Sequence, residues 1–229
     1  FTGAEPNVAL NGDIVYVNPS ATIIIANPDG SIASSIKTNW DALNEGYEYI
    51  YPALSADGSL VAHVDRSADR TIPTYIRQVT VKTRAGNLVA TFPNFTQPAW
   101  TPDGRLVMVG DEGNFLNGIY ITDASLRGVT RLDPLLNGSQ MPAVSPDGKL
   151  ILFINTNALW SMNLDGTNQR MLDNTAKIAW PVYSRDGRYA LVIIADPSSA
   201  TGQCLGVVVT GGIAEGTPPS GFVLTDANG

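Results

Sequence analysis

The sequence has little charge, one cysteine, one histidine and no long apolar run. It contains 14 Lys and Arg against 21 Asp and Glu, which gives a net charge of −7. Nucleic-acid binding needs cations clustered against the phosphates, so this composition argues against a nucleic-acid partner. The apolar runs at 190–195 and 207–209 have the length of strands and fall short of the ~18–20 residues that cross a membrane. We therefore expect no membrane span.

The single cysteine and histidine limit the chemistry further. Cys204 cannot form a disulfide within the chain, and we expect it to be a buried, inert thiol on a strand. His63 alone cannot build a multi-histidine metal site, and its place in an apolar strand favours a structural histidine, hydrogen-bonded to its neighbours, over a catalytic base. No glycine-rich loop opens a helix, so the sequence gives no support for nucleotide binding.

What the sequence does contain is a repeated turn. The pattern Pro-x-x-Ser/Thr-x-Asp-Gly begins at Pro52, Pro98, Pro142 and Pro181. A weaker copy occupies 9–12. The glycines of these copies stand 46, 46, 44 and 39 residues apart, and they are Gly12, Gly58, Gly104, Gly148 and Gly187. Such a period is typical of repeats of four strands each.

Short apolar runs rich in β-branched residues separate the turns, which predicts strands and not helices. The third repeat, for example, contains such runs at 99–101, 106–109, 119–122 and 129–132. We therefore predict an all-β fold, a five-bladed β-propeller with four-stranded antiparallel blades. A single domain spans 1–229, with blades at about 7–38, 50–93, 97–133, 141–173 and 180–226.

The aspartate of the turn invites a functional interpretation, but turn chemistry explains the motif. Proline presets φ for the second turn position, serine or threonine suits the first, and glycine accepts a left-handed conformation cheaply. We therefore interpret the motif as structural.

The pattern Pro-x-Trp-Ser-Pro-Asp-Gly followed by an apolar strand resembles the repeat of TolB-like β-propellers, which also occurs in the propeller domains of prolyl-oligopeptidase-type peptidases. The resemblance covers all five repeats and is strong in the last four. It implies a binding platform or gating domain. Propellers of this family usually have six blades, one more than this sequence predicts, and no hydrolase domain accompanies the repeats.

In such propellers the first strand of each blade lines a central channel. We expect these strands at 8–10, 52–55, 98–101, 142–145 and 181–184, and none of them contains an acid, a histidine or a lysine. Glycosidic cleavage needs two carboxyl groups, so the sequence disfavours an enzyme. The aspartates show no calcium-loop spacing, which leaves calcium as a weak alternative to having no cofactor.

The candidate binding surface lies in the longer connections, because the other connections are short and glycine-bearing. The segment 40–51 concentrates aromatic and acidic residues that suit protein contacts, although packing between blades is the competing interpretation. Further loop acids would favour a basic partner or a cation. The candidate partner-binding residues are Trp40, Glu45, Tyr47, Glu48, Tyr49, Asp65, Asp69, Asp111, Glu112 and Asp196.

The leading hypothesis is a non-catalytic binding or scaffold module, extracellular, at the cell surface or periplasmic, that holds a protein partner through its loop face. The chain begins at Phe1, which suggests removal of a leader. The alternatives are a self-assembling structural subunit of an extracellular assembly and an enzyme acting on a glycan or lactone. Two sequons, at Asn94 and Asn137, are open to glycosylation in a secreting eukaryote.

Overall fold

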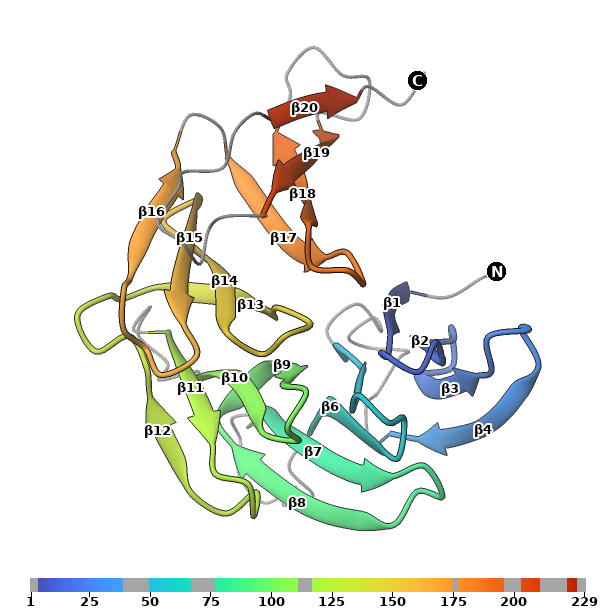
Figure 1. Cartoon of the computed structure of the whole chain (residues 1–229). Helices are drawn as coiled ribbons and strands as arrows, with labels where there is room; N and C mark the ends of the chain where they lie inside the picture. Colours follow the sequence, from blue (N-terminus) through green and yellow to red (C-terminus); the bar gives the residue numbers. More distant parts are fainter. Residues whose placement is uncertain are drawn as a thin grey trace. The chain divides into compact units, whose positions relative to one another are not determined.

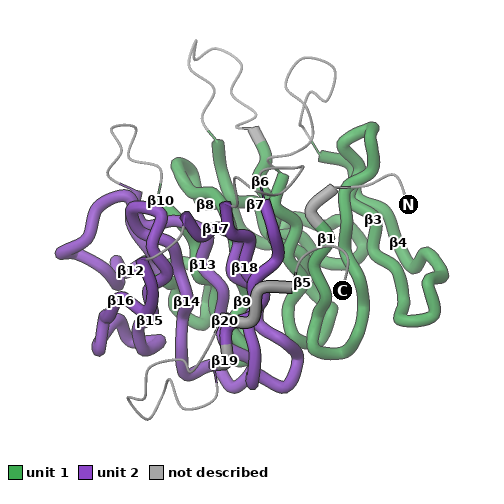
Figure 2. The backbone as a smooth tube through the Cα atoms, turned by 90° about the horizontal axis from the view of Figure 1, so that it is seen from above, with its two compact units in different colours: residues 1–112, 121–129 green, residues 113–120, 130–229 purple. Residues whose placement is uncertain are grey.

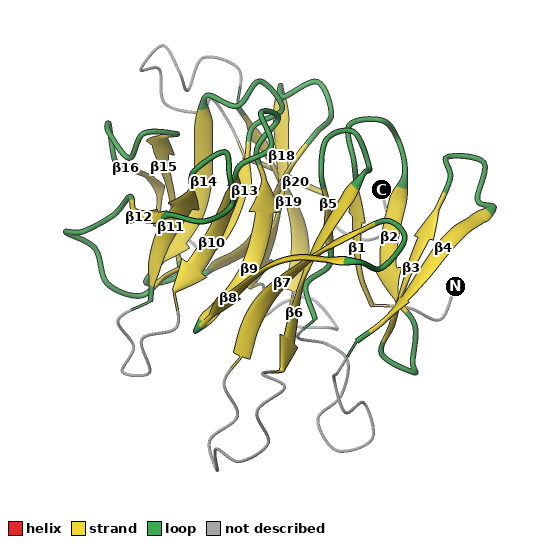
Figure 3. Cartoon of the chain, turned by 90° about the horizontal axis from the view of Figure 1, so that it is seen from below, coloured by secondary structure: helices red, strands yellow, loops and turns green. Residues whose placement is uncertain are grey.

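The structure is a computed structural model that describes residues 4–38, 50–66, 77–110, 117–174, 177–195, 203–210 and 222–225. Over these ranges the regular elements are strands, and no helix occurs (Figure 3). None of the described segments is therefore a helix long and apolar enough to cross a membrane.

The described ranges contain twenty strands, in five groups along the chain. The first group is β1 (Ala4–Val8), β2 (Ile14–Val17), β3 (Thr22–Ala26) and β4 (Ile32–Lys37). The second is β5 (Ala53–Leu54), β6 (Leu60–Arg66), β7 (Arg77–Thr83) and β8 (Leu88–Pro93). The third is β9 (Phe95–Trp100), β10 (Leu106–Gly110), β11 (Gly118–Thr122) and β12 (Val129–Arg131). The fourth is β13 (Ser139–Val144), β14 (Leu150–Asn155), β15 (Ala158–Asn163) and β16 (Arg170–Asp173). The fifth is β17 (Ile178–Tyr183), β18 (Tyr189–Ala195), β19 (Gln203–Val209) and β20 (Phe222–Thr225).

Each group forms one four-stranded sheet in which the strands follow one another in chain order (Figure 1). Neighbouring strands run antiparallel, as in the complete ladder from Leu150↔Asn163 to Asn155↔Ala158 between β14 and β15. The five sheets are the blades of a five-bladed β-propeller, so the predicted fold class is confirmed.

In four of the five blades the first strand begins earlier than the sequence predicted, and β5 lies inside the predicted range. We expected the first strand of the first blade at 8–10, but β1 covers Ala4–Val8 and includes Glu5. The expectation that no first strand contains an acid is therefore wrong for this blade. Pro6 explains the shift, because it precedes Gly12 by the same six residues that separate Pro52 from Gly58, so the repeat starts upstream of the weak turn signal.

The chain divides into two compact units, which are coloured separately in Figure 2: unit 1 comprises 1–112 and 121–129, and unit 2 comprises 113–120 and 130–229. The core of unit 1 is aliphatic and includes Val15, Ile25 and Val79, none of which is exposed to solvent. Trp100 Nε1 donates a hydrogen bond to Ala53 O at 3.0 Å, which ties the third blade to the second.

In unit 2 a second cluster joins the fourth and fifth blades. It contains Leu152, Ile154, Val192 and Ile194, and Cys204 packs against it from β19. Cys204 is half-buried there, so its thiol is less enclosed than we expected. In the fourth blade the strand β14 is buried at all of its positions.

The Ser-x-Asp-Gly corners explain why the motif recurs. In the second blade, Ser55 Oγ donates to Asp57 Oδ1 at 2.7 Å and accepts the Leu60 N–H at 3.0 Å. The same carboxylate oxygen accepts the Ser59 N–H at 3.0 Å, and Gly58 adopts a φ of 72°. These bonds lower the pKa of the Asp57 carboxyl, chiefly through the Ser55 hydroxyl. The aspartate is therefore committed to the turn, which supports the structural interpretation.

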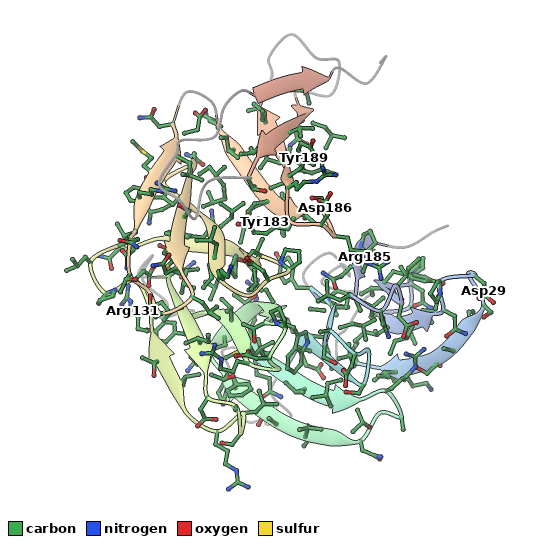
Figure 4. All side chains as sticks on the ribbon, viewed as in Figure 1. Asp29, Arg131, Tyr183, Arg185, Asp186 and Tyr189 are labelled. Atoms are coloured by element: carbon green, nitrogen blue, oxygen red, sulfur yellow. The ribbon has the colours of Figure 1, made fainter. Side chains whose placement is uncertain are left out.

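The corners at Thr101, Ser145 and Ser184 repeat this arrangement. Asp186 belongs to the Ser184 corner, in the turn between β17 and β18 (Figure 4). Asp29 lies in the corresponding way in the turn between β3 and β4. The Ser184 hydroxyl and the Arg188 backbone lower the pKa of Asp186 to about 2.

Arg84 links the first two blades within unit 1. Its Nη1 pairs with Asp13 Oδ2, and its Nη2 donates to Asn27 Oδ1 at 3.2 Å. Asn11 Nδ2 donates to the same Asp13 oxygen at 3.0 Å and to Asp57 O at 3.0 Å. Asp13 is only 6% exposed, and Arg84 is the main cause of its lowered pKa.

Candidate binding surface

Nine of the ten candidate residues lie outside the described residues. They are Trp40, Glu45, Tyr47, Glu48, Tyr49, Asp69, Asp111, Glu112 and Asp196. Their role in partner binding stays a prediction.

Asp65 is the described candidate, and its predicted place in a solvated loop is wrong. It lies on β6 with 1% of its surface exposed, so its carboxylate cannot reach a partner at the surface. The strand continues further than predicted because Asp65 pairs with Gln78 and Arg66 pairs with Arg77 on β7.

His63 lies two residues earlier on the same face of β6 and is fully buried. Its Nε2 lies 3.4 Å from Asp65 Oδ2, and its Nδ1 has no hydrogen-bond partner among the described residues. Burial lowers the pKa of His63, and the nearby Asp65 opposes that shift. The ring is therefore a neutral part of the interior, as the structural interpretation predicted, with a contact to Asp65 in place of a hydrogen-bonded network.

Asp133 is a buried acid of unit 2, at the connection between β12 and β13. Its Oδ1 accepts the Ile119 N–H at 2.8 Å and lies 3.3 Å from Nε of Arg131, whose position Figure 4 shows. Burial raises the pKa of this carboxyl despite these partners. The arrangement anchors the start of β11 and presents no accessible carboxylate.

The sequon hydroxyls are buried. Thr96 lies on β9 and is 7% exposed, and Ser139 on β13 has no exposed surface. Asn94 forms the one-residue connection between β8 and β9, with a φ of 63°. Within the described ranges, no three His, Cys, Asp or Glu side chains gather closely enough to hold a metal ion.

One feature that the sequence analysis missed recurs in four blades. The residue before the motif proline has a left-handed backbone although it is not glycine, with φ of 47° at Tyr51, 51° at Gln97, 54° at Met141 and 52° at Trp180. In β9, β13 and β17 the pairing register shifts at this point. A bulge of this kind re-aims a side chain, and bulges are common beside functional sites. The signal in the sequence was the recurring proline itself, since proline disfavours the right-handed helical region for the residue before it.

In unit 2 two of these residues meet. The Trp180 N–H donates to Met141 Sδ at 3.3 Å, from one blade to the next. Trp180 is 40% exposed, and Val182 beside it on β17 is 56% exposed.

Val182 belongs to a wider apolar face of the fifth blade. It pairs with Leu191 on β18, which is 48% exposed, and Tyr189 and Leu205 are 42% and 54% exposed. Strand alternation places Val182, Tyr189, Leu191 and Leu205 on the face opposite the core cluster of unit 2, and we call these four residues the blade-5 face. Tyr189 is visible at the start of β18 in Figure 4. The equivalent strand β14 is buried at every position, whereas β18 alternates between buried and open positions.

The arrangement of five such sheets defines a propeller, and comparison with known proteins identifies the type. No protein-family model and no curated protein matches the sequence. Among solved structures, a protein assigned as TolB in Agrobacterium tumefaciens is 17% identical, with a TM-score of 0.74 over 96% of this chain and 78% of its own. TolB from Acinetobacter baumannii is 18% identical, with a TM-score of 0.66 over 93% of this chain and 52% of its own. An oligogalacturonate lyase in complex with manganese is 11% identical, with a TM-score of 0.62 over 93% of this chain and 62% of its own.

These likenesses concern the fold. The predicted resemblance to TolB-like β-propellers is thereby confirmed at that level. Enzymes with related propellers occur among the similar structures as well, so the fold alone does not choose between binding and catalysis.

Proposed function

We propose that this chain is a non-catalytic binding or scaffold module that holds a protein partner outside the cytoplasm. The observation that carries the proposal is the blade-5 face, whose four large side chains are each at least 42% exposed. A contiguous apolar patch on the face of a blade marks an interaction site. The likeness to TolB proteins supports the same function.

The extracytoplasmic location rests on composition. Charged residues make up only 15% of the chain, so we expect a surface rich in uncharged polar residues, as is common outside the cytoplasm. The loop residues predicted from the sequence, Tyr47 and Tyr49 among them, are proposed as a second contact region for the same partner.

Site-specific photo-crosslinking in cells of the source organism tests the proposal. A benzophenone amino acid at Val182 should capture one defined protein. The same amino acid at Met171, which is 48% exposed on β16 and lies outside the blade-5 face, serves as the matched control. Equal labelling at both positions, or no adduct at Val182, would contradict the proposal.

The same face favours a second candidate function, a self-assembling subunit, because an uncharged apolar surface can also meet its own copy. Light scattering at increasing concentration decides between the two. A constant monomer mass removes self-assembly, and an adduct containing only this chain removes the separate partner.

The non-catalytic part of the proposal is tested directly. Incubation with oligogalacturonate, with and without manganese, should leave the substrate intact. Turnover that is lost on denaturation of the protein would overturn this part.

A further inference from the structure

Within each unit, consecutive blades pack face to face. In unit 2, Leu152 of β14 and Val192 of β18 share one core cluster, so the fourth blade packs against the fifth. In unit 1, both sides of β6 contribute to the core, with Val61 on one side and Ala62 on the other. A blade therefore has a leading face towards the preceding blade and, on the opposite side of its sheet, a trailing face towards the following blade.

The blade-5 face is a trailing face, because it lies opposite the side of β18 that packs against the fourth blade. The corner of the fourth blade closes on Leu150 O, and that of the fifth closes on Tyr189 O. Leu152 and Leu191 each follow two residues later, so they hold equivalent positions. Leu152 has no exposed surface, whereas Leu191 is 48% exposed. The blade-5 face thus has the geometry of a surface that packs against a following blade.

The first blade exposes a face of the complementary type. Val8 of β1 pairs with Ile14 of β2, on the side of the sheet opposite Val15 and the core of unit 1, and we call Val8 and Ile14 the blade-1 face. The equivalent pair beside the corner of the second blade, Leu54 and Val61, is buried in that core. Val8 is 60% exposed, against 4% for Leu54. The blade-1 face is therefore a leading face that is open to solvent.

One occupant accounts for both exposed faces. The blade-5 face is of the trailing type and the blade-1 face of the leading type, and in both units trailing faces pack against leading faces. Both are apolar, so their contact removes hydrocarbon from water without burying a charge. We propose that the blade-5 face binds the blade-1 face of a second copy of this chain. This contact specifies the second candidate function, the self-assembling subunit, on which it rests.

The proposed contact joins two different surfaces. The copies at the two ends of an assembly therefore keep one blade-1 face and one blade-5 face for further copies. A contact of this kind closes into a ring or grows into a filament, according to the rotation between the copies. A symmetric contact between two blade-5 faces would instead stop at a dimer.

Two single variants block the two faces separately. Val182→Asp places a charge in the blade-5 face, and Val8→Asp places a charge in the blade-1 face. Met171→Asp is the matched control, because Met171 is 48% exposed on β16 outside both faces. Cooperative urea unfolding verifies that each variant is folded. Leu205→Asp and Val8→Lys replace any face variant that does not unfold cooperatively.

Sedimentation velocity of the purified chain over a range of concentrations is the measurement. Wild type and Met171→Asp should form species larger than a monomer. Self-association should weaken at least about tenfold in Val182→Asp and in Val8→Asp, as for hot-spot residues. A mixture of these two variants should form a one-to-one dimer and nothing larger, because one intact blade-5 face then meets one intact blade-1 face.

A wild-type chain that stays monomeric at its highest soluble concentration would overturn the inference. If a benzophenone at Val182 then captures another protein, the leading proposed function still stands, so the two failures are distinguishable. Undiminished self-association of Val8→Asp alone would also overturn the inference, because the copies would then meet through another pair of surfaces. In that case self-assembly remains and only this contact is removed.

Discussion

Two turn glycines with nearly the same backbone differ in what surrounds them, and this difference predicts unequal costs of substitution. Gly58 has a φ of 72° and Gly104 a φ of 85°, so alanine at either position adopts a left-handed backbone. A Cβ at Gly104 would find nothing within 4 Å, whereas a Cβ at Gly58 would lie 2.5 Å from Asn11 Nδ2 and 2.8 Å from Asp13 Oδ2. Only Gly58→Ala therefore disturbs the contacts that Arg84 organises.

The magnitudes follow from these surroundings. Gly104→Ala carries the backbone term alone, about 1–2 kcal/mol of unfolding free energy. Gly58→Ala carries the same term and also displaces hydrogen bonds to a charged carboxylate, which are worth about 1.5–3 kcal/mol. We expect Gly58→Ala to be less stable than Gly104→Ala by about 2 kcal/mol.

Urea unfolding followed by tryptophan fluorescence measures both free energies by linear extrapolation. Arg84→Met provides the control, because it removes the cation from the network. In that background the extra cost of Gly58→Ala should shrink, and the double-mutant cycle should show coupling between the two sites. Equal costs for the two glycines, or additive effects of Gly58→Ala and Arg84→Met, would refute the assignment of the difference to this network.

Three further predictions concern pH. The pKa of Asp186 is about 2 in the folded protein against 3.8 in the unfolded chain, so the folded state gains stability above pH 3.8 that is lost as the pH falls towards 2. In urea titrations at a series of pH values, Asp186→Asn should lose this part of the acid sensitivity. Because the pKa of His63 is lowered in the folded protein, its contribution to the unfolding free energy is complete above pH 6.5 and declines below it, as the unfolded chain takes up the proton. His63→Leu should therefore flatten the dependence of stability on pH just below pH 6.5. An unchanged slope would count against a neutral buried ring. The pKa of Asp133 is raised, so the pH dependence runs the other way, and stability should fall as the pH rises from 3.8 through the folded-state pKa. Asp133→Asn retains an acceptor for the Ile119 N–H and should remove that fall. A steeper fall in the variant would contradict burial as the cause.

The repeated turn was sufficient to predict the blades, because its residues act locally. Each corner is closed by bonds between residues at most five positions apart, such as Ser55 to Leu60, so the sequence of a few residues determines its geometry. Five such corners with apolar runs between them predicted five antiparallel sheets of four strands.

The candidate site was less accessible from the sequence, for two physical reasons. The burial of Asp65 depends on the pairing of β6 with β7, which involves residues distant in the chain, and a polar residue at a strand end looks like a loop acid. The left-handed residues before the prolines differ in type, so a comparison of residue identities between the repeats does not identify Tyr51, Met141 and Trp180. A search of the positions that flank the invariant proline would have found them.

The local closure of the corners has a consequence for how such molecules change in evolution. In the last four blades a hydroxyl and a carboxylate within the corner hydrogen-bond to each other, so a duplicated segment with this motif already contains the bonds that close its corner. Gain or loss of a whole module therefore requires new contacts only where its faces meet its neighbours. We expect variation in module number among related proteins to leave the corner residues unaltered, while the faces of the flanking modules change.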